Sequence, residues 1–261
     1  KKHKTKLPPD ELIKKQLNTN FRIMEQIRAR VDTVVNNPSI ATALKPYYPY
    51  GCKRPAFHDE FLPTFNLPHV TLVDTAPHGV QKINGRGIVH EGQEYPLDVL
   101  IYATGFQWMG TASFNMIVGI DGRSLKDKWQ EEGTRTFLGI HSEGFPNLFI
   151  MSGPQGGGGQ FNFIRGLEAH TDYIVWMMET MRLKGATVVD VSKDFENEYA
   201  KHCRQADIVT SPLRDCLSYY NGDGTAEPGS LAYYGGPAKW HERREEAQKS
   251  MAPYILKTHS T

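Results

Sequence analysis

The pattern of apolar and polar positions predicts three helices. Apolar residues recur every three or four positions from Leu12 to about Val35 and over 163–183, and we also expect a helix over 193–207. This spacing places apolar side chains on one face of a helix. Asn36-Asn37-Pro38 should end the first helix, because these residues are typical of helix ends and turns.

Other stretches predict strands. The nearly continuous apolar runs 99–103 and 148–151 are typical of strands buried on both faces. Residues 79–93 predict a small hairpin or meander with turns at Asn84-Gly85 and Glu91-Gly92. Further short strands are expected at 70–74 and 188–191.

The alternation of strands, loops and helices predicts an α/β fold with a mainly parallel sheet. In such sheets, ligands bind beyond the carboxyl ends of the strands. The turns at 103–106 and 152–161 are therefore the first places to expect a site.

Composition and charge exclude several classes. The 261 residues include 30 Lys and Arg against 29 Asp and Glu, a formal charge of +1. This balance offers no reason to expect nucleic acid or an anionic membrane as a partner, and a nucleic-acid module would rest only on Lys1–Lys6. No apolar run approaches the ~20 residues of a membrane helix, and no secretory signal opens the chain. We expect a cytoplasmic protein.

The usual catalytic and metal signatures are missing. The three cysteines form no CxxC pair, the histidines form no HExxH motif, and Ser152 does not lie in a GxSxG motif. No metal site is expected.

Two loops carry candidate chemistry. The run Gly156–Gly159 follows an apolar strand and precedes a helix, as a phosphate-binding loop does. It does not match the phosphate-loop motifs, so a flexible loop is an equal interpretation. In the second loop, Pro55 restrains Arg54 beside Lys53. The pair is either solvated surface charge or, if the loop is packed, a site for an anion.

Four segments resemble Baeyer–Villiger monooxygenases, the FAD- and NADPH-dependent class B monooxygenases. They are Tyr48–Pro55 (YPYGCKRP), Asn66–Asp74 (NxxxVxLVD), Asp98–Phe106 (DxLIYATGF) and Gly144–Phe149 (GFPNLF). Their order and spacing match the family, and the resemblance covers nearly the whole chain from about residue 45. The ATGF turn is shared with related flavin monooxygenases, whereas the GxKR loop together with the C-terminal segment is more specific.

The resemblance implies insertion of one O2-derived oxygen into a ketone, through a C4a-peroxyflavin, to give an ester or lactone. Arg54 matches the catalytic arginine, which stabilises negative charge beside the flavin. Lys53 matches the lysine that contacts the 2′-phosphate of NADPH.

The resemblance also implies further cofactor and substrate contacts. Ala103, Thr104 and Gly105 match the turn near the cofactors, and Asn162 and Phe163 lie beside the flavin ring. Tyr219 stands where several relatives carry a tryptophan that binds the nicotinamide nucleotide. The active-site loop that shapes substrate scope matches Gly158, Gly159, Gln160 and Phe161.

The two GxGxxG loops and the FxGxxxHxxxW signature of the family do not occur here. The resemblance therefore implies the C-terminal half of a flavoprotein with two dinucleotide-binding domains, with a Rossmann-like parallel sheet, a small β-meander and helices. The expected partner is an upstream half of the same enzyme. The expected parts are the end of the NADPH domain with the Lys53-Arg54 linker (1–70), the second part of the FAD domain (71–210) and an active-site or lid segment (211–261).

Two alternatives remain open. An N- or S-hydroxylating flavin monooxygenase shares the ATGF turn. A non-catalytic binding protein derived from the fold would explain the missing nucleotide loops, whereas the adjacent Lys53 and Arg54 favour an enzyme.

Overall fold

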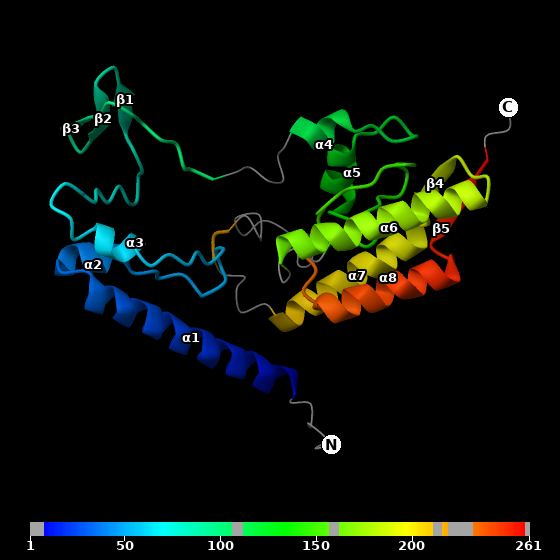
Figure 1. Cartoon of the computed structure of the whole chain (residues 1–261), viewed down its shortest axis with the longest axis horizontal. Helices are drawn as coiled ribbons and strands as arrows, with labels where there is room; N and C mark the ends of the chain where they lie inside the picture. The colour runs from blue at the N-terminus through cyan, green and yellow to red at the C-terminus, as the bar shows by residue number, and fades with distance from the viewer. Residues whose placement is uncertain (1–7, 106–111, 157–161, 211–215, 219–231, 259–261) are drawn as a thin grey trace. The chain divides into compact units, whose positions relative to one another are not determined.

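The computed structural model describes residues 8–105, 112–156, 162–210, 216–218 and 232–258. The chain divides into two compact units, one of residues 18–106 and one of residues 1–17 with 107–261 (Figure 1). No helix in the described ranges is long and apolar enough to cross a membrane.

The unit of residues 18–106 begins with helices, and the predicted helix end at Asn36-Asn37-Pro38 is confirmed. The Asn37 side chain accepts hydrogen bonds from the amides of Ser39 and Ile40 and so caps the second helix. A small core of Val31, Val35 and Ala41 packs where the first two helices meet. The helices are α1 (Pro9–Val34), which continues into this unit from the other, α2 (Pro38–Leu44) and α3 (Phe61–Thr64).

The predicted meander is also confirmed. Strands β1 (Lys82–Asn84), β2 (Gly87–His90) and β3 (Gln93–Pro96) form an antiparallel sheet in the order β1-β2-β3. The first turn is held by Asn84, whose Oδ1 accepts from the amides of Arg86 (2.9 Å) and Gly87 (3.0 Å). Such local side-chain bonds explain why asparagine favours turns.

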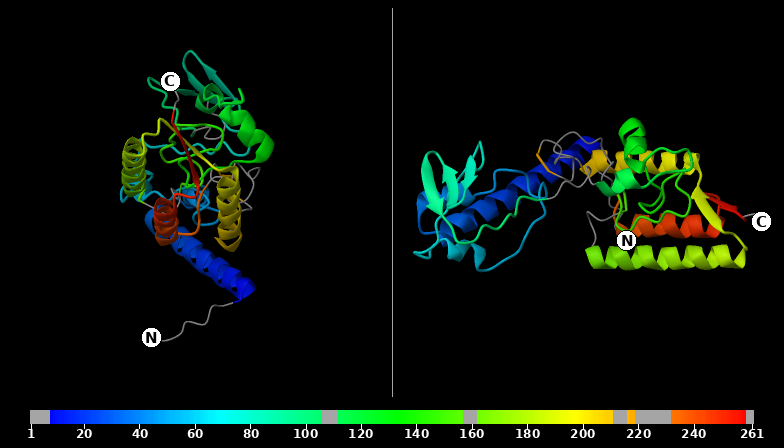
Figure 2. Two further views of the ribbon diagram at one scale, coloured as in Figure 1. Left: turned by 90° about the vertical axis from the view of Figure 1, so that its right-hand side faces the viewer. Right: turned by 90° about the horizontal axis from the view of Figure 1, so that it is seen from above.

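The larger unit is built around three long helices, which run alongside one another in Figures 1 and 2, with α7 opposite in direction to α6 and α8. Its largest apolar core includes Tyr173 from α6, Tyr199 from α7 and Trp240 from α8, each at most 2% exposed. The elements are α4 (Ala112–Met116), α5 (Leu125–Glu132), α6 (Phe163–Leu183), β4 (Val188–Val191), α7 (Lys193–Thr210), α8 (Pro237–Ser250) and β5 (Tyr254–Lys257). The predicted helix over 163–183, the strand over 188–191 and the helix beginning at 193 are all confirmed.

Asn147, in the GFPN segment, borders the free edge of β4. Its amide donates to the Val189 carbonyl (2.8 Å), its Oδ1 accepts from the Val189 amide (2.9 Å), and its Nδ2 donates to the Thr187 carbonyl (3.0 Å). Asn147 thus supplies the bonds that a second neighbouring strand would make, and its positive φ of 58° suits asparagine.

A buried ion cluster joins α5 to α7. Lys128 is fully buried, and its Nζ lies 2.9 Å from Oε2 of Glu196. The other carboxylate oxygen accepts from the Glu143 amide (2.8 Å) and the Ser142 hydroxyl (3.1 Å). Burial raises the pKa of the Glu196 carboxyl, whereas the Lys128 charge and these donors lower it.

The prediction of a mainly parallel sheet is wrong for the described residues, because both sheets there are antiparallel. The runs 70–74, 99–103 and 148–151 form no strand. A strand exists only where another backbone offers donors and acceptors. Strand β4 has such a neighbour in β5, whereas no described strand pairs with these three runs. In 148–151 the Ile150 amide donates to the Ile140 carbonyl (2.8 Å), but this bond does not extend into a ladder.

Candidate functional site: exposed cations and the amino end of helix α6

The loop that carries Lys53 and Arg54 is held against helix α1 by Asn20. The Asn20 Nδ2 donates to the carbonyl of Tyr50 (2.7 Å), and its Oδ1 accepts from the amide of Tyr50 (3.0 Å). Lys53 extends over the ring of Tyr48, with its Nζ 5.5 Å from the ring centroid. The loop therefore has a defined backbone and an aromatic support for one of its cations.

The Arg54 side chain is exposed to solvent. Among the described residues it forms no ion pair and donates to no carboxylate, unlike Arg28, Arg86 and Arg123, which all pair with acids. Pro55 follows directly and restricts the Arg54 backbone. A guanidinium in this state is available to an anionic ligand.

The run 99–103 leads to the predicted cofactor turn and is the largest departure from expectation. Instead of a buried strand, Val99 is 73% exposed, Ile101 82% and Tyr102 70%. Ala103, Thr104 and Gly105 are exposed as well. The turn itself is present, since Gly105 has a φ of 91°, which favours glycine.

The other described candidates, Asn162 and Phe163, lie at the amino end of α6. Asn162 is the N-cap, and its Oδ1 accepts from the Arg165 amide (3.2 Å). Phe163 is the first residue of the helix and is 44% exposed. Asn162 thus has a structural role that its position before an apolar-periodic helix could have predicted.

The structure keeps the described candidates in two groups. Lys53, Arg54 and the 103–105 turn belong to one unit, and Asn162 with Phe163 belongs to the other. Tyr219 and the loop residues Gly158, Gly159, Gln160 and Phe161 lie outside the described residues.

The loop before α6 is more ordered at its start than its composition suggests. Gly156, the first glycine of the run, is buried. Gln155 is 1% exposed, its Oε1 accepts from the Thr136 amide (3.0 Å), and its carbonyl accepts from the Tyr199 hydroxyl (2.8 Å). The interpretation of a flexible loop therefore does not apply to Gly156. Sequence reasoning missed Gln155, whose contacts with Thr136 and Tyr199 join it to distant parts of the chain.

The most strongly shifted pKa values belong to the packed interior and not to the exposed candidates. Burial lowers the pKa of His141 to about 3 and raises that of Cys203 to about 12. His141 Nε2 lies 2.8 Å from the Tyr173 hydroxyl, which donates to Tyr254 (2.8 Å). These groups hold α6, β5 and the 137–141 turn together.

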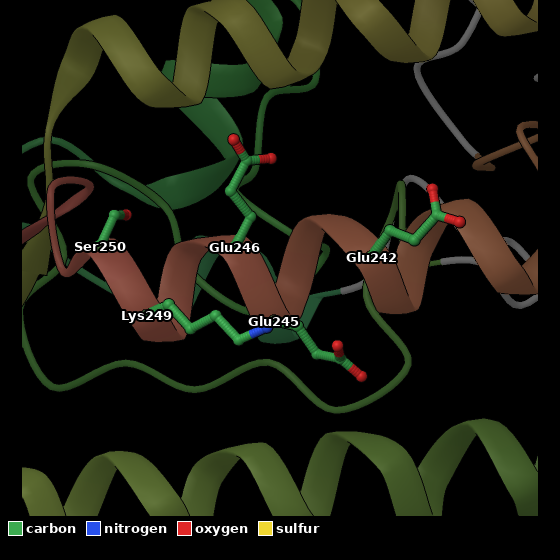
Figure 3. Close-up of a pocket in the computed structure, with 5 residues that line it drawn as sticks. All are labelled: Glu242, Glu245, Glu246, Lys249 and Ser250. Carbon is green, nitrogen blue, oxygen red and sulfur yellow. The ribbon is translucent and has the colours of Figure 1, made fainter.

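A hollow of about 540 Å³ lies on α8 (Figure 3). The described residues that line it belong to that helix: Glu242, Glu245, Glu246, Lys249 and Ser250. Three carboxylates against one ammonium repel a phosphate, so this hollow is not a nucleotide site. The described residues also contain no group of three His, Cys, Asp or Glu side chains that could hold a metal ion.

Comparison with known proteins shows what the chain is similar to. The chain is 41% identical over 229 residues to pentalenolactone D synthase of Streptomyces exfoliatus, covering 83% of this chain and 38% of that protein. It is 38% identical over 245 residues to a Baeyer–Villiger monooxygenase of Streptomyces coelicolor, covering 88% of this chain and 40% of that protein. This chain is homologous to the C-terminal part of Baeyer–Villiger monooxygenases.

The fold agrees with this relationship. The solved structure of polycyclic ketone monooxygenase from Thermothelomyces thermophila superposes with a TM-score of 0.82 at 31% identity, covering 98% of this chain and 44% of that one. The fold is therefore part of the Baeyer–Villiger flavoprotein fold with its two dinucleotide-binding domains. No model of a protein family matches the chain. The chain spans about two fifths of the length of the curated relatives it matches.

The described residues fit the cofactors of these Baeyer–Villiger relatives. Solved structures of similar fold include complexes with FAD and NADP. Lys53 and the exposed Arg54 are suited to phosphate or to negative charge on a ring system, and the exposed ring of Phe163 can contact a flat ligand. The glycine at 105 allows a ligand to approach the backbone closely.

Proposed function

We propose that this chain is the C-terminal part of an FAD- and NADPH-dependent Baeyer–Villiger monooxygenase that converts a ketone to an ester or lactone with O2. The observation that carries the proposal is the Lys53-Arg54 pair, exposed in a restrained loop within the family motif. Bound flavin and NADPH would supply the reducing chemistry that activates O2. The homology favours this reaction over N- or S-hydroxylation and over a non-catalytic protein.

Arg54 would stabilise negative charge that develops on the flavin and on the oxygenated ketone. A guanidinium keeps its charge at any physiological pH, and the restrained backbone presets its direction. Lys53 would contact the 2′-phosphate of NADPH. Because the Lys53 side chain already lies over Tyr48, it loses less conformational entropy when it binds a phosphate.

The remaining candidates would shape the cofactor site. Ala103, Thr104 and Gly105 would form the turn near the cofactors, and Asn162 and Phe163 would lie beside the flavin ring. Tyr219 would bind the nicotinamide nucleotide, and the loop Gly158–Phe161 would shape substrate scope. Two proteins of similar structure are named for multi-ring substrates, polycyclic ketone monooxygenase and steroid monooxygenase. A bulky, multi-ring ketone is therefore the substrate class we propose.

An upstream part would complete the enzyme, supplying the two nucleotide-binding loops that this sequence does not contain. The chain's coverage of two fifths of its relatives supports this. The exposed apolar run 99–103 supports it too, because a neighbouring strand from that part would cover Val99 and Ile101. The parts we propose for this chain are 1–70, the end of the NADPH domain, 71–210, the second part of the FAD domain, and 211–261, an active-site segment. We also propose that the enzyme is cytoplasmic.

The test joins this chain to the upstream part and compares Arg54→Ala with Arg30→Ala, which removes another exposed arginine of the same unit. We expect Arg54→Ala to bind NADPH and reduce flavin normally but to lose ester formation by at least about a hundredfold. Arg30→Ala should behave like the unmodified protein. Ester formation that survives in Arg54→Ala would disprove the assignment.

A further inference from the structure

The segment 152–156 immediately precedes the proposed substrate loop and has an unusual backbone. Ser152 and Gln155 both have positive φ values, 55° and 64°. Such values are uncommon outside glycine and persist where surrounding contacts impose them. The contacts of Gln155 with Thr136 and Tyr199 account for one of the two positions.

His170 on α6 contacts both ends of the segment, Ser152 and Gly156. It is 2% exposed, its Nδ1 lies 3.2 Å from the Ser152 amide nitrogen, and its Nε2 lies 3.2 Å from the Gly156 carbonyl oxygen. The Ser152 N–H can only donate, so Nδ1 accepts and carries no proton, and Nε2–H donates to Gly156. Burial lowers the pKa of His170, which keeps the imidazole in this neutral form.

Gly156 is confined from two sides. A Cβ at position 156 would lie 2.9 Å from His170 Cε1, and a Cβ at Gly139 would lie 2.1 Å from the Gly156 Cα. Only glycine therefore fits at either position. This glycine serves close packing, whereas the sequence alone suggested flexibility for the run that it begins.

The imidazole ring is itself held in place. It stacks on Trp240 with ring centroids 5.2 Å apart and an interplanar angle of 28°. Trp240 is 1% exposed, and its Nε1 donates to the Leu138 carbonyl (3.1 Å). Both edges and one face of the His170 ring are thus determined by contacts.

We propose that His170 is a positioning residue that fixes Gly156 to α6 and thereby sets the base of the substrate loop. Gly156 is bound by His170, and Asn162 caps the same helix. Gly156 and Asn162, which flank the segment 157–161, are therefore both positioned by contacts with α6, whose first residue is Phe163. On the proposed function, on which this inference rests, His170 affects ketone binding and leaves the reduction of flavin by NADPH unchanged.

The test compares three substitutions of His170 in the complete protein that contains this chain. His170→Gln places an amide donor near the Nε2 position and keeps the contact with Gly156. His170→Asn places an acceptor near the Nδ1 position and keeps only the contact with Ser152, and His170→Ala keeps neither. The control is His141→Gln, which replaces another buried histidine of the same unit that contacts Tyr173 and not the 152–156 segment.

The first readout is hydrogen–deuterium exchange of the Gly156 amide, which donates to the Gly153 carbonyl (3.1 Å). This measurement needs neither cofactor nor activity. We expect His170→Ala and His170→Asn to speed exchange about tenfold or more, because the Gly156 carbonyl loses its buried donor. His170→Gln and His141→Gln should stay within about twofold of the unmodified protein. Equal exchange in His170→Asn and the unmodified protein would overturn the proposal, even if His170→Ala does not fold.

The second readout separates ketone binding from flavin reduction. We expect a ketone KM raised about tenfold in His170→Asn, with the rate of flavin reduction unchanged and with rescue by His170→Gln. A fall in kcat without a change in KM would overturn the positioning role. If the unmodified protein forms no ester, the proposed function is wrong, and the expected effect on KM no longer applies. The exchange measurement would still show whether His170 fixes Gly156.

Discussion

Residues 99–103 and 188–191 are both apolar runs, and both were expected to form strands. Residues 188–191 do so as β4, which pairs with β5, and Val189 and Val191 are fully buried. Residues 99–103 pair with no described strand, and Ile101 is 82% exposed. An apolar run predicts that a segment will be covered, but the cover depends on which neighbours the chain provides.

Charged residues show the same contrast. Lys128 is fully buried and bonded to Glu196 and Ser142. Arg54 is exposed and has no acidic partner among the described residues. The buried charges of Lys128 and Glu196 satisfy each other, whereas Arg54, which is assigned to the cofactors, leaves its donors available among the described residues. This is the difference expected between a packed scaffold and the open part of a site.

The largest difference between the two runs is expected when a carboxylate is placed in each of them. Val189→Asp should destabilise the protein by more than about 4 kcal/mol, because an unpaired charge would be buried beside β5. Ile101→Asp should change the free energy of unfolding by less than about 0.5 kcal/mol in this chain. Urea unfolding followed by circular dichroism measures both, and equal effects would show that 99–103 is buried after all.

The buried ion cluster should respond nearly as strongly. Lys128→Met should cost about 3–5 kcal/mol, because the Glu196 carboxylate would stay buried without its cation. Adding Glu196→Leu should restore much of that loss. Lys201→Met, which removes an exposed lysine from the same helix as Glu196, is the control and should change stability by less than about 0.5 kcal/mol. A double variant no more stable than Lys128→Met would contradict this account.

Acidification should weaken the packed region through His141. Its pKa is about 3 in the folded protein against 6.5 for an unperturbed histidine. The unfolded chain therefore binds the proton first, and stability falls as pH decreases from 6.5 towards 3. The slope from this one group is about 1.4 kcal/mol per pH unit. Unfolding free energies measured between pH 7 and pH 5 should show a shallower slope in His141→Gln; identical slopes would exclude His141 as a source.

The smallest effect is expected at the proposed catalytic arginine. Arg54→Ala should change the free energy of unfolding by less than about 0.5 kcal/mol, since the side chain is exposed and forms no ion pair with any residue that the structure describes. Lys45→Ala, which removes the ion pair with Asp32 (2.6 Å), should cost up to about 1 kcal/mol. Thermal melts of the two variants provide the measurement. A large loss in Arg54→Ala would mean that Arg54 stabilises the fold.

Local features were predictable from the sequence. Helix α6 spans 163–183 as its apolar spacing predicts, and Asn84-Gly85 and Glu91-Gly92 form the turns of the meander. Each of these depends on bonds between residues close along the chain, so a short stretch of sequence contains the cause. The motifs around Arg54 and Gly105 likewise indicated the family, because they are contiguous residues in a fixed order.

Other features depend on contacts between distant segments and could be identified only from the tertiary structure. Thr136 and Tyr199 are far from Gln155 in the sequence yet hold it in a left-handed conformation. His170 and Gly139 confine Gly156, and Asn147 takes the place of a strand beside β4. Local sequence patterns were enough to predict the helices, the turns and the family that the chain resembles. Packing determined which apolar runs are covered and which glycine is rigid, because burial and hydrogen bonding between distant segments exist only once the chain has folded.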